Sequence, residues 1–218
     1  MWGLKFTLEG LYFTSFRRPT STSIIMTYPV PPYTTIRGLL SNVLGLNRDD
    51  YRIQEWFKIG IKPLDVSNKS REMAKLLKLK GSGKKYQKGF PSSPLFREFL
   101  IKPEYEIFLV GDENNINSIY NYLINPVRPL YLGSSDDLVD IEVGEPIQVS
   151  MDESTEISSV LGGVYENSII EKLPYKFHKK GKNFILEYKT ISIPKSDKLN
   201  LSEPITCLNY NNELVWVT

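Results

Sequence analysis

Two adjacent arginines near the start of the chain, Arg17 and Arg18, have side chains suited to binding a phosphate. Guanidinium groups form short, charge-assisted hydrogen bonds with phosphate oxygens. Further on, Thr34 or Thr35 can cap a helix, and Arg37 follows in its first turn. A helix N-terminus offers free N–H groups and partial positive charge to an anion. We therefore predict that these five residues form one pocket for a nucleic-acid backbone; the alternative is that the arginines are surface charges paired with acids.

The second candidate is a basic window, residues 69–88, which contains eight lysines and arginines against one acid, with Phe90 just beyond it. Cations can follow the phosphates of a single strand while aromatic rings stack on its bases. Lysine-rich segments are also often solvated loops, and charge alone supports the two interpretations equally. If the window binds nucleic acid, the predicted contacts are Lys78, Lys80, Lys84, Lys85, Tyr86 and Lys88.

Other chemistry has few candidates. His178 is the only histidine and Cys207 the only cysteine, so one chain cannot assemble a zinc site from about four such ligands. His178 lies in a polar, turn-like stretch that suits a Ser/His/Asp triad poorly. Asp136 and Asp137 could hold magnesium, although a solvated acidic face is favoured. We predict no metal and no cofactor, and the single cysteine fits a reducing, cytoplasmic setting.

The spacing of apolar side chains predicts the elements that must position these residues. Prolines between Tyr28 and Tyr33 force an extended approach to a helix over 35–45, which Gly45 can close in a left-handed turn. A second helix is predicted over 113–124. Strands are predicted over 2–8, 52–62, 96–110 with a break at Pro103, and 137–149.

The predicted order is strand, helix, strand, strand, helix, strand, which is the ferredoxin-like or RRM-like pattern. The fold class is therefore α+β. Residues 1–150 form this domain, with a basic excursion at about 66–95 between two paired strands. Residues 151–218 are expected to form a small β-rich domain packed on the first. Its candidate strands are 163–173, 183–193 and 213–217.

The segment 134–156 contains eight acidic residues and no basic one. Because like charge repels phosphate, this segment is expected to face protein partners rather than nucleic acid. The alternating N-terminal residues do not resemble a signal peptide. No apolar run approaches the roughly 20 residues that a membrane helix needs, so no membrane partner is expected.

Two sequence motifs carry a resemblance to a known family. The first is Phe16-Arg17-Arg18-Pro19 followed by Tyr28-Pro29, Pro31-Pro32 and Thr-Ile-Arg-Gly-Leu-Leu at 35–40. The second is SPLFREFLIKPEY at 93–105, which contains Arg97. Together they resemble the fifth family of CRISPR-associated (Cas) proteins, in the RAMP superfamily. The motifs span most of the first 110 residues, and the last third resembles the family only loosely.

The resemblance implies a subunit of a type I CRISPR interference complex, Cascade, most similar to the type I-B or I-A branch. Such a subunit serves antiviral defence by binding the 5′ handle of the guide crRNA and capping the backbone filament. It contacts the backbone subunit and the large subunit in a hetero-oligomeric complex. Its long β-hairpin thumb would lie at 66–95. The resemblance therefore favours RNA contact by the basic window and by Arg97.

Two other functions are alternatives to that of a non-catalytic subunit. One branch of the family is a metal-independent endoribonuclease that cleaves repeat RNA with a cluster including histidine, lysine and tyrosine. Here the single histidine makes that cluster hard to build, although Lys84 and Tyr86 could form a poor substitute. The other alternative is a generic RRM-like RNA-binding protein, which needs exposed aromatics on its central strands. The equivalent positions could equally be core: Leu4, Phe6, Ile107 and Leu109.

Overall fold

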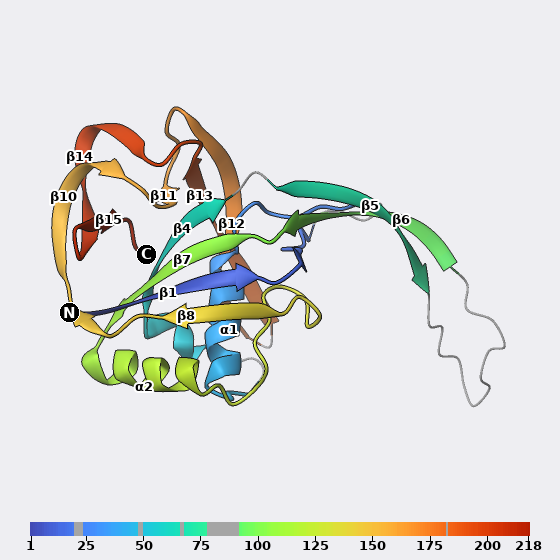
Figure 1. Ribbon diagram of the computed structural model, residues 1–218, viewed down its shortest axis with the longest axis horizontal. Coiled ribbons are helices and arrows are strands. Elements are labelled where there is room, and N and C mark those ends of the chain that lie inside the picture. Colours follow the sequence, from blue (N-terminus) through green and yellow to red (C-terminus); the bar gives the residue numbers. More distant parts are fainter. Residues whose placement is uncertain (20–23, 48–49, 66–67, 78–91, 182) are drawn as a thin grey trace.

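The computed structural model of the protein describes residues 1–218 except 20–23, 48–49, 66–67, 78–91 and 182 (Figure 1). The fold is α+β, as predicted, and consists mostly of strands with two α-helices in the described residues. The elements are β1 (Trp2–Gly10), β2 (Phe13–Thr14), β3 (Ile24–Ile25), α1 (Tyr33–Val43), a 3₁₀ helix (Tyr51–Glu55), β4 (Lys58–Asp65), β5 (Lys69–Leu77), β6 (Ser92–Ile101), β7 (Glu104–Gly111), α2 (Glu113–Ile124), β8 (Val139–Val143), β9 (Ile147–Gln148), β10 (Ser150–Ile157), β11 (Leu161–Gly162), β12 (Ser168–Lys180), β13 (Asn183–Pro194), β14 (Leu199–Tyr210) and β15 (Glu213–Val215).

A five-stranded antiparallel sheet forms the centre of the molecule, in the order β4-β7-β1-β8 with β9 also paired to β1. The predicted strand at 2–8 is confirmed as β1. Its alternation places Leu4, Phe6 and Leu8 on one face, where they are fully or almost fully buried. Their register partners across the ladder are the equally buried residues of β7: Leu109, Ile107 and Tyr105.

The two helices cover that buried face of the central sheet (Figure 1). Helix α2 occupies the predicted residues 113–124. Helix α1 begins at Tyr33, directly after Pro32, so Thr34 and Thr35 lie inside its first turn. The predicted threonine cap is therefore wrong: Pro32 is the N-cap residue, and no side chain caps this end. Gly45 closes the helix in the left-handed region, with a φ of 66°, as predicted.

A two-stranded ribbon, β5 and β6, follows β4 and precedes β7 in the sequence. Strands β4 and β7 pair with each other, and the ribbon projects far from the body (Figure 1). The single strand predicted at 96–110 is instead β6 and β7, which belong to different sheets. The break falls at Lys102, with a φ of 44°, and at Pro103, which cannot donate to a ladder. The strand predicted at 52–62 starts only at Lys58, because a 3₁₀ helix precedes it.

The C-terminal residues form two three-stranded sheets, β10-β14-β15 and β11-β13-β12. The predicted candidates correspond to β12, β13 and β15, whereas β10 and β14 were not predicted. Residues 151–218 were expected to form a small domain packed on the first, and three of their residues, Leu173, Ile191 and Ile193, lie in the main core beside α1. Leu208 and Val215 join a second cluster on the opposite face of the central sheet. In the described residues, no helix is long and apolar enough to cross a membrane.

The glycines Gly60 and Gly38 give a matched test of this packing. A Cβ on Gly60 in β4 would lie 2.7 Å from Cγ1 of Val215, so Gly60→Ala should lower the free energy of unfolding by about 1–3 kcal/mol through overpacking. Gly38 in α1 has nothing within 4 Å of such a Cβ, so Gly38→Ala should raise it by roughly 0.5–1 kcal/mol. Urea unfolding of both variants measures this, and a neutral Gly60→Ala would show that β15 does not pack against β4.

Candidate nucleic-acid interface

The two arginines at the start of the first motif have different environments. Arg17 is exposed and forms an isolated bridge with Thr27 through the backbone. Arg18 is half-buried: it forms an ion pair with Glu171 of β12, lies 4.6 Å from the ring centroid of Tyr28, and donates from Nε to the Thr27 carbonyl at 3.2 Å. Arg18 therefore joins two parts of the body, and Arg17 is the one whose side chain faces solvent.

Arg37 does not join this pair. It is only 3% exposed and donates from Nη1 to the carbonyl of Tyr175. Tyr175 and Glu171 are four residues apart in β12, which corresponds to roughly 13 Å along an extended strand. The predicted five-residue pocket is therefore not formed, because the helix places Arg37 in the interior. Thr34 and Thr35 are half-buried, and Thr34 lines a groove of about 570 Å³ together with Phe177 on the outer side of α1.

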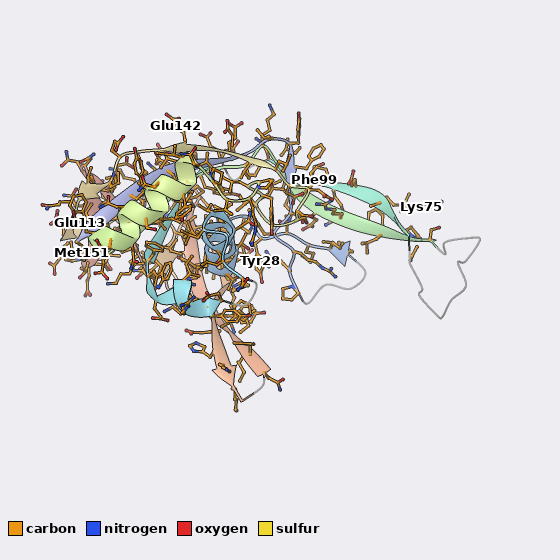
Figure 2. The ribbon with its side chains drawn as sticks, turned by 90° about the horizontal axis from the view of Figure 1, so that it is seen from below. Tyr28, Lys75, Phe99, Glu113, Glu142 and Met151 are labelled. Atoms are coloured by element: carbon orange, nitrogen blue, oxygen red, sulfur yellow. The ribbon has the colours of Figure 1, made fainter. Side chains whose placement is uncertain are left out.

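The described part of the basic window lies in the ribbon, in β5. Lys69 and Arg71 each hold Glu98 of β6 at 2.7 Å, and Glu98 also accepts a hydrogen bond from the backbone N–H of Thr27 at 3.3 Å. Lys75 lies further out and is exposed (Figure 2). The other predicted contacts lie outside the described residues: Lys78, Lys80, Lys84, Lys85, Tyr86 and Lys88.

Glu98 fastens the base of the ribbon to segment 24–28. Its side chain is 4% exposed. Burial alone would raise the pKa of Glu98, but hydrogen bonds from Lys69 and Arg71 outweigh it and hold the pKa below the ordinary value of 4.5. Two cations of the basic window are thus partly neutralised and serve to position the ribbon.

Arg97 lies at the same base and pairs with Asp137 at 3.5 Å, with its side chain 32% exposed. Asp137 is buried and also accepts hydrogen bonds from the backbone N–H groups of Ser15 and Ser134. The expected acidic face therefore does not include Asp137. Among the described residues, no three potential metal ligands lie together.

The ribbon also carries an exposed apolar pair that sequence reasoning missed. Met73 and Phe96 are register partners, 67% and 48% exposed. Residues directly opposite in a ladder share a face, so this pair lies on the same side as Lys75, two positions along β5. An exposed aromatic ring beside a cation is the arrangement that stacks on a base of a single strand. Phe96 was inside the second motif, and its exposure depends on the ribbon leaving the body.

The central sheet offers no such platform at its middle. Leu4, Phe6, Ile107 and Leu109 are at most 1% exposed and belong to the core. On the opposite face, Phe108 is fully buried beneath Tyr210, with ring centroids 5.6 Å apart. Beside it, Lys5 and Lys62 form ion pairs of 2.6–3.1 Å with Glu106 and Glu213. The generic RRM-like alternative therefore lacks its exposed central aromatics.

A protein-family model described as CRISPR-associated protein (Cas_Cas5) matches residues 3–196. The chain belongs to this family. No curated protein matches the sequence. The family assignment confirms the resemblance carried by the two motifs, and it covers far more of the chain than they do.

Solved structures share the fold at low identity. A chain of a CRISPR RNA-guided surveillance complex has a TM-score of 0.58 at 12% identity, covering 88% of this chain and 92% of that one. A CRISPR protein from Archaeoglobus fulgidus has a TM-score of 0.55 at 13% identity, covering 99% and 98%. A chain of the Type III-B Cmr-beta complex bound to cognate target RNA has a TM-score of 0.53 at 11% identity, covering 90% and 86%.

The histidine of this Cas_Cas5 family member lies in strand β12 rather than in a turn. His178 Nε2 is 2.5 Å from a carboxylate oxygen of Glu187 on the neighbouring strand, and both side chains are exposed. Figure 2 shows this β12–β13 hairpin and the β5–β6 ribbon projecting in different directions. Among the described residues, the histidine is therefore separated from the candidate RNA surface.

The buried carboxylate at the base of the ribbon predicts a pH effect. Glu98→Gln should lower the free energy of unfolding by about 1–3 kcal/mol at pH 7, because it removes a charged partner of Lys69 and Arg71. The folded pKa of Glu98 is depressed, so its contribution is present above about pH 4.5 and is lost as pH falls through the lower folded value. Urea unfolding of both proteins between pH 7 and pH 3 should show the difference shrinking.

Glu156→Gln is the matched control, because Glu156 pairs with Lys198 at 2.7 Å with both side chains 55% exposed. Exposed pairs contribute little, so this variant should unfold like the wild type. A difference for Glu98→Gln that stays constant down to pH 3 would show that Glu98 acts through packing alone.

Proposed function

We propose that this chain is a non-catalytic subunit of a type I-B or I-A CRISPR effector complex, in the cytoplasm, that binds the 5′ handle of the guide crRNA and caps the backbone filament. Family membership over residues 3–196 is the observation that carries the proposal. Two similar structures, of a CRISPR RNA-guided surveillance complex and of a Type III-B Cmr-beta complex with RNA, support placing it in such an assembly.

The sheet order supports a ferredoxin-like core for this subunit. Numbered within the βαββαβ unit, β1, β4, β7 and β8 are strands one to four, and they lie in the order two, three, one, four. The two helices connect strand one to strand two and strand three to strand four on the same face. This order supports the proposed split βαβ arrangement, which the predicted element order also favours.

The β5–β6 ribbon is the proposed thumb. It carries Lys75 and the exposed Phe96, while the body beside its base presents Arg17; the other predicted basic contacts follow Leu77 in the sequence, outside the described residues. Thr27 connects these parts, because its backbone faces Arg17 and its N–H donates to Glu98 of the ribbon. A single RNA strand running from the base outward would meet guanidinium, aromatic and lysine groups in succession.

The protein partners are proposed to be the backbone subunit and the large subunit. Strand β8 is an edge of the central sheet, and its exposed residues Asp140 and Glu142 repel phosphate. These carboxylates therefore face protein in the proposed complex. They lie on the central sheet, which also contains β4 and β7, the two strands that flank the ribbon in sequence. Strand β8 forms the opposite edge of this sheet from β4.

RNA affinity should depend on salt and on Arg17. For single-stranded RNA the log–log slope of affinity against salt is about −0.7 per phosphate neutralised, so replacing Lys84, Lys85 and Lys88 by alanine should flatten it by roughly 2.

Arg17→Ala should weaken handle binding about tenfold, because a charge-assisted hydrogen bond contributes roughly 1.5–3 kcal/mol. Fluorescence anisotropy with a labelled handle RNA at several salt concentrations measures both.

Arg52→Ala is the control for a lost surface charge, because Arg52 is 76% exposed, lies in the 3₁₀ helix outside the ribbon and is paired with Asp50. The Arg52→Ala variant should leave the affinity for handle RNA, and the slope of that affinity against salt, unchanged. Equal weakening by Arg17→Ala and Arg52→Ala would mean that the protein attracts RNA only through its overall charge. An unchanged slope for the triple variant would remove the basic window from the RNA site.

The pure chain should leave repeat RNA intact, with or without magnesium. The reason is that metal-free cleavage needs acid and base groups around the 2′-hydroxyl, and the only histidine, His178, is engaged with Glu187 on a separate hairpin. Gel analysis of RNA after prolonged incubation tests this. Specific cleavage that disappears in His178→Ala or Tyr86→Phe would establish the endoribonuclease alternative instead.

A further inference from the structure

The β12–β13 hairpin extends beyond the core and exposes apolar side chains at its outer end. Leu173, Ile191 and Ile193 anchor its inner end in the main core. Further out, Phe184 and Ile185 of β13 are 43% and 49% exposed, and Figure 2 shows this end projecting away from the body. Large apolar side chains gathered in solvent at the end of a projecting hairpin indicate a contact surface.

The alternation of side chains along the two strands divides the outer end of the hairpin into two faces. Phe184 is the register partner of Lys179, and Phe177, two positions before Lys179 in β12, shares their face. Ile185 and His178 are register partners on the opposite face. The face that carries the two phenylalanines is therefore separate from the only histidine.

A third ring completes the Phe184 face. Tyr51, at the start of the 3₁₀ helix, has its ring centroid 5.2 Å from that of Phe177 and 4.4 Å from that of Phe184, and none of the three residues is fully buried. Gln54 fixes the helix to the hairpin, because its Nε2 donates to the Phe177 carbonyl at 3.1 Å and its Oε1 accepts from the Phe177 N–H at 2.7 Å. The aromatic platform, defined as Tyr51, Phe177 and Phe184, is thus held in place before any ligand binds.

The charge beside the aromatic platform is positive. Residues 176–189 contain five lysines and a single acid. Lys179 and Lys180 are exposed, and no carboxylate pairs with either of them in the part of the chain that the structure describes. The acid, Glu187, contacts His178 on the opposite face. A ligand on the platform therefore meets lysines whose charge is not neutralised by the protein.

A groove beside the platform extends this surface along the outer side of α1. Its volume is about 570 Å³, and two of the platform rings line it together with Arg128 and Tyr131. Arg128 is exposed, and its printed partners are backbone carbonyls. Asp50 is the one carboxylate among the described lining residues, and Arg52 already pairs with it at 2.6 Å. The groove thus adds a cation and a fourth ring in a volume that suits a nucleotide-sized group.

We propose that the platform and the groove bind a single-stranded nucleic acid, with bases stacked on the rings and phosphates beside Lys179, Lys180 and Arg128. An acidic protein segment would match the lysines, but nucleic-acid bases also match the flat rings. Every base has a face that can stack and the cations contact phosphates, so the site takes RNA and DNA strands alike and reads no sequence. It is distinct from the β5–β6 ribbon, which projects in a different direction (Figure 2), and it does not depend on handle binding.

The test is fluorescence anisotropy of the full chain with labelled oligo(U) and oligo(dT) of equal length. The parent protein is the triple alanine variant of the basic window described above, so that binding through that window is removed. Phe184→Leu should weaken binding of both probes about tenfold, because it removes a stacking ring but keeps an apolar side chain. Phe184→Tyr, which keeps a ring, should bind like the parent. Lys179→Gln together with Lys180→Gln should flatten the log–log slope of affinity against salt by roughly 1.4.

Two matched controls separate the platform from the rest of the surface. Ile185→Ala changes an exposed apolar residue on the opposite face of the same hairpin, and Lys58→Gln with Lys195→Gln removes two exposed charges elsewhere. Both controls should bind the probes like the parent. Equal weakening by Phe184→Leu and Ile185→Ala, or equal flattening by the two lysine pairs, would overturn the site. So would a parent that binds neither probe, or binds only one of them. These outcomes do not depend on whether the ribbon binds the handle, because the parent already lacks the basic window's lysines.

Discussion

Strands β4 and β7 are neighbours in the central sheet although the whole β5–β6 ribbon lies between them in sequence, and this pairing constrains the rest of the molecule. Antiparallel neighbours can be joined by two residues, so a connection this long must leave the sheet and return to it. The two halves of the excursion pair with each other and form an extended ribbon. An exposed surface can therefore project from the core, and only the base of the ribbon, with the buried Leu100 of β6, takes part in the packing of that core.

The elements of the core can be predicted from the sequence, whereas some of those in the outer parts of the fold cannot. Strand β1 and helix α2 follow from periodicity, because one side of each is fully buried and every second or every third-to-fourth residue must be apolar. Strand β10 has a weak pattern, with polar residues at most positions and only Ile157 fully buried. Its place is set by pairing with β14, some fifty residues later in the chain, which local spacing does not reveal.

The candidate site shows the same difference between what local spacing predicts and what contacts distant in sequence determine. Arg18 and Arg37 are close in sequence and of one type, yet their partners lie 153 and 138 residues away in β12. The path of β12 past these two arginines places the Glu171 carboxylate beside Arg18 and the Tyr175 carbonyl beside Arg37. Local motifs could indicate which residues bind anions, but not that Arg37 faces the interior while Arg17 stays in solvent. The exposure of Phe96 likewise depends on where the ribbon leaves the body.

The outer edge of β4 is not left open, because residues at the far end of the sequence pair with it. The N–H of Ile59 donates to the carbonyl of Thr218 at 2.9 Å, and the N–H of Thr218 donates back at 3.2 Å. During synthesis, β1, β4 and β7 can assemble long before residues 213–218 leave the ribosome. Until then the edge of β4 presents unpaired backbone groups, which are a template for pairing with other chains. The nascent protein thus passes through an interval in which its central sheet has an open edge that can pair with other chains.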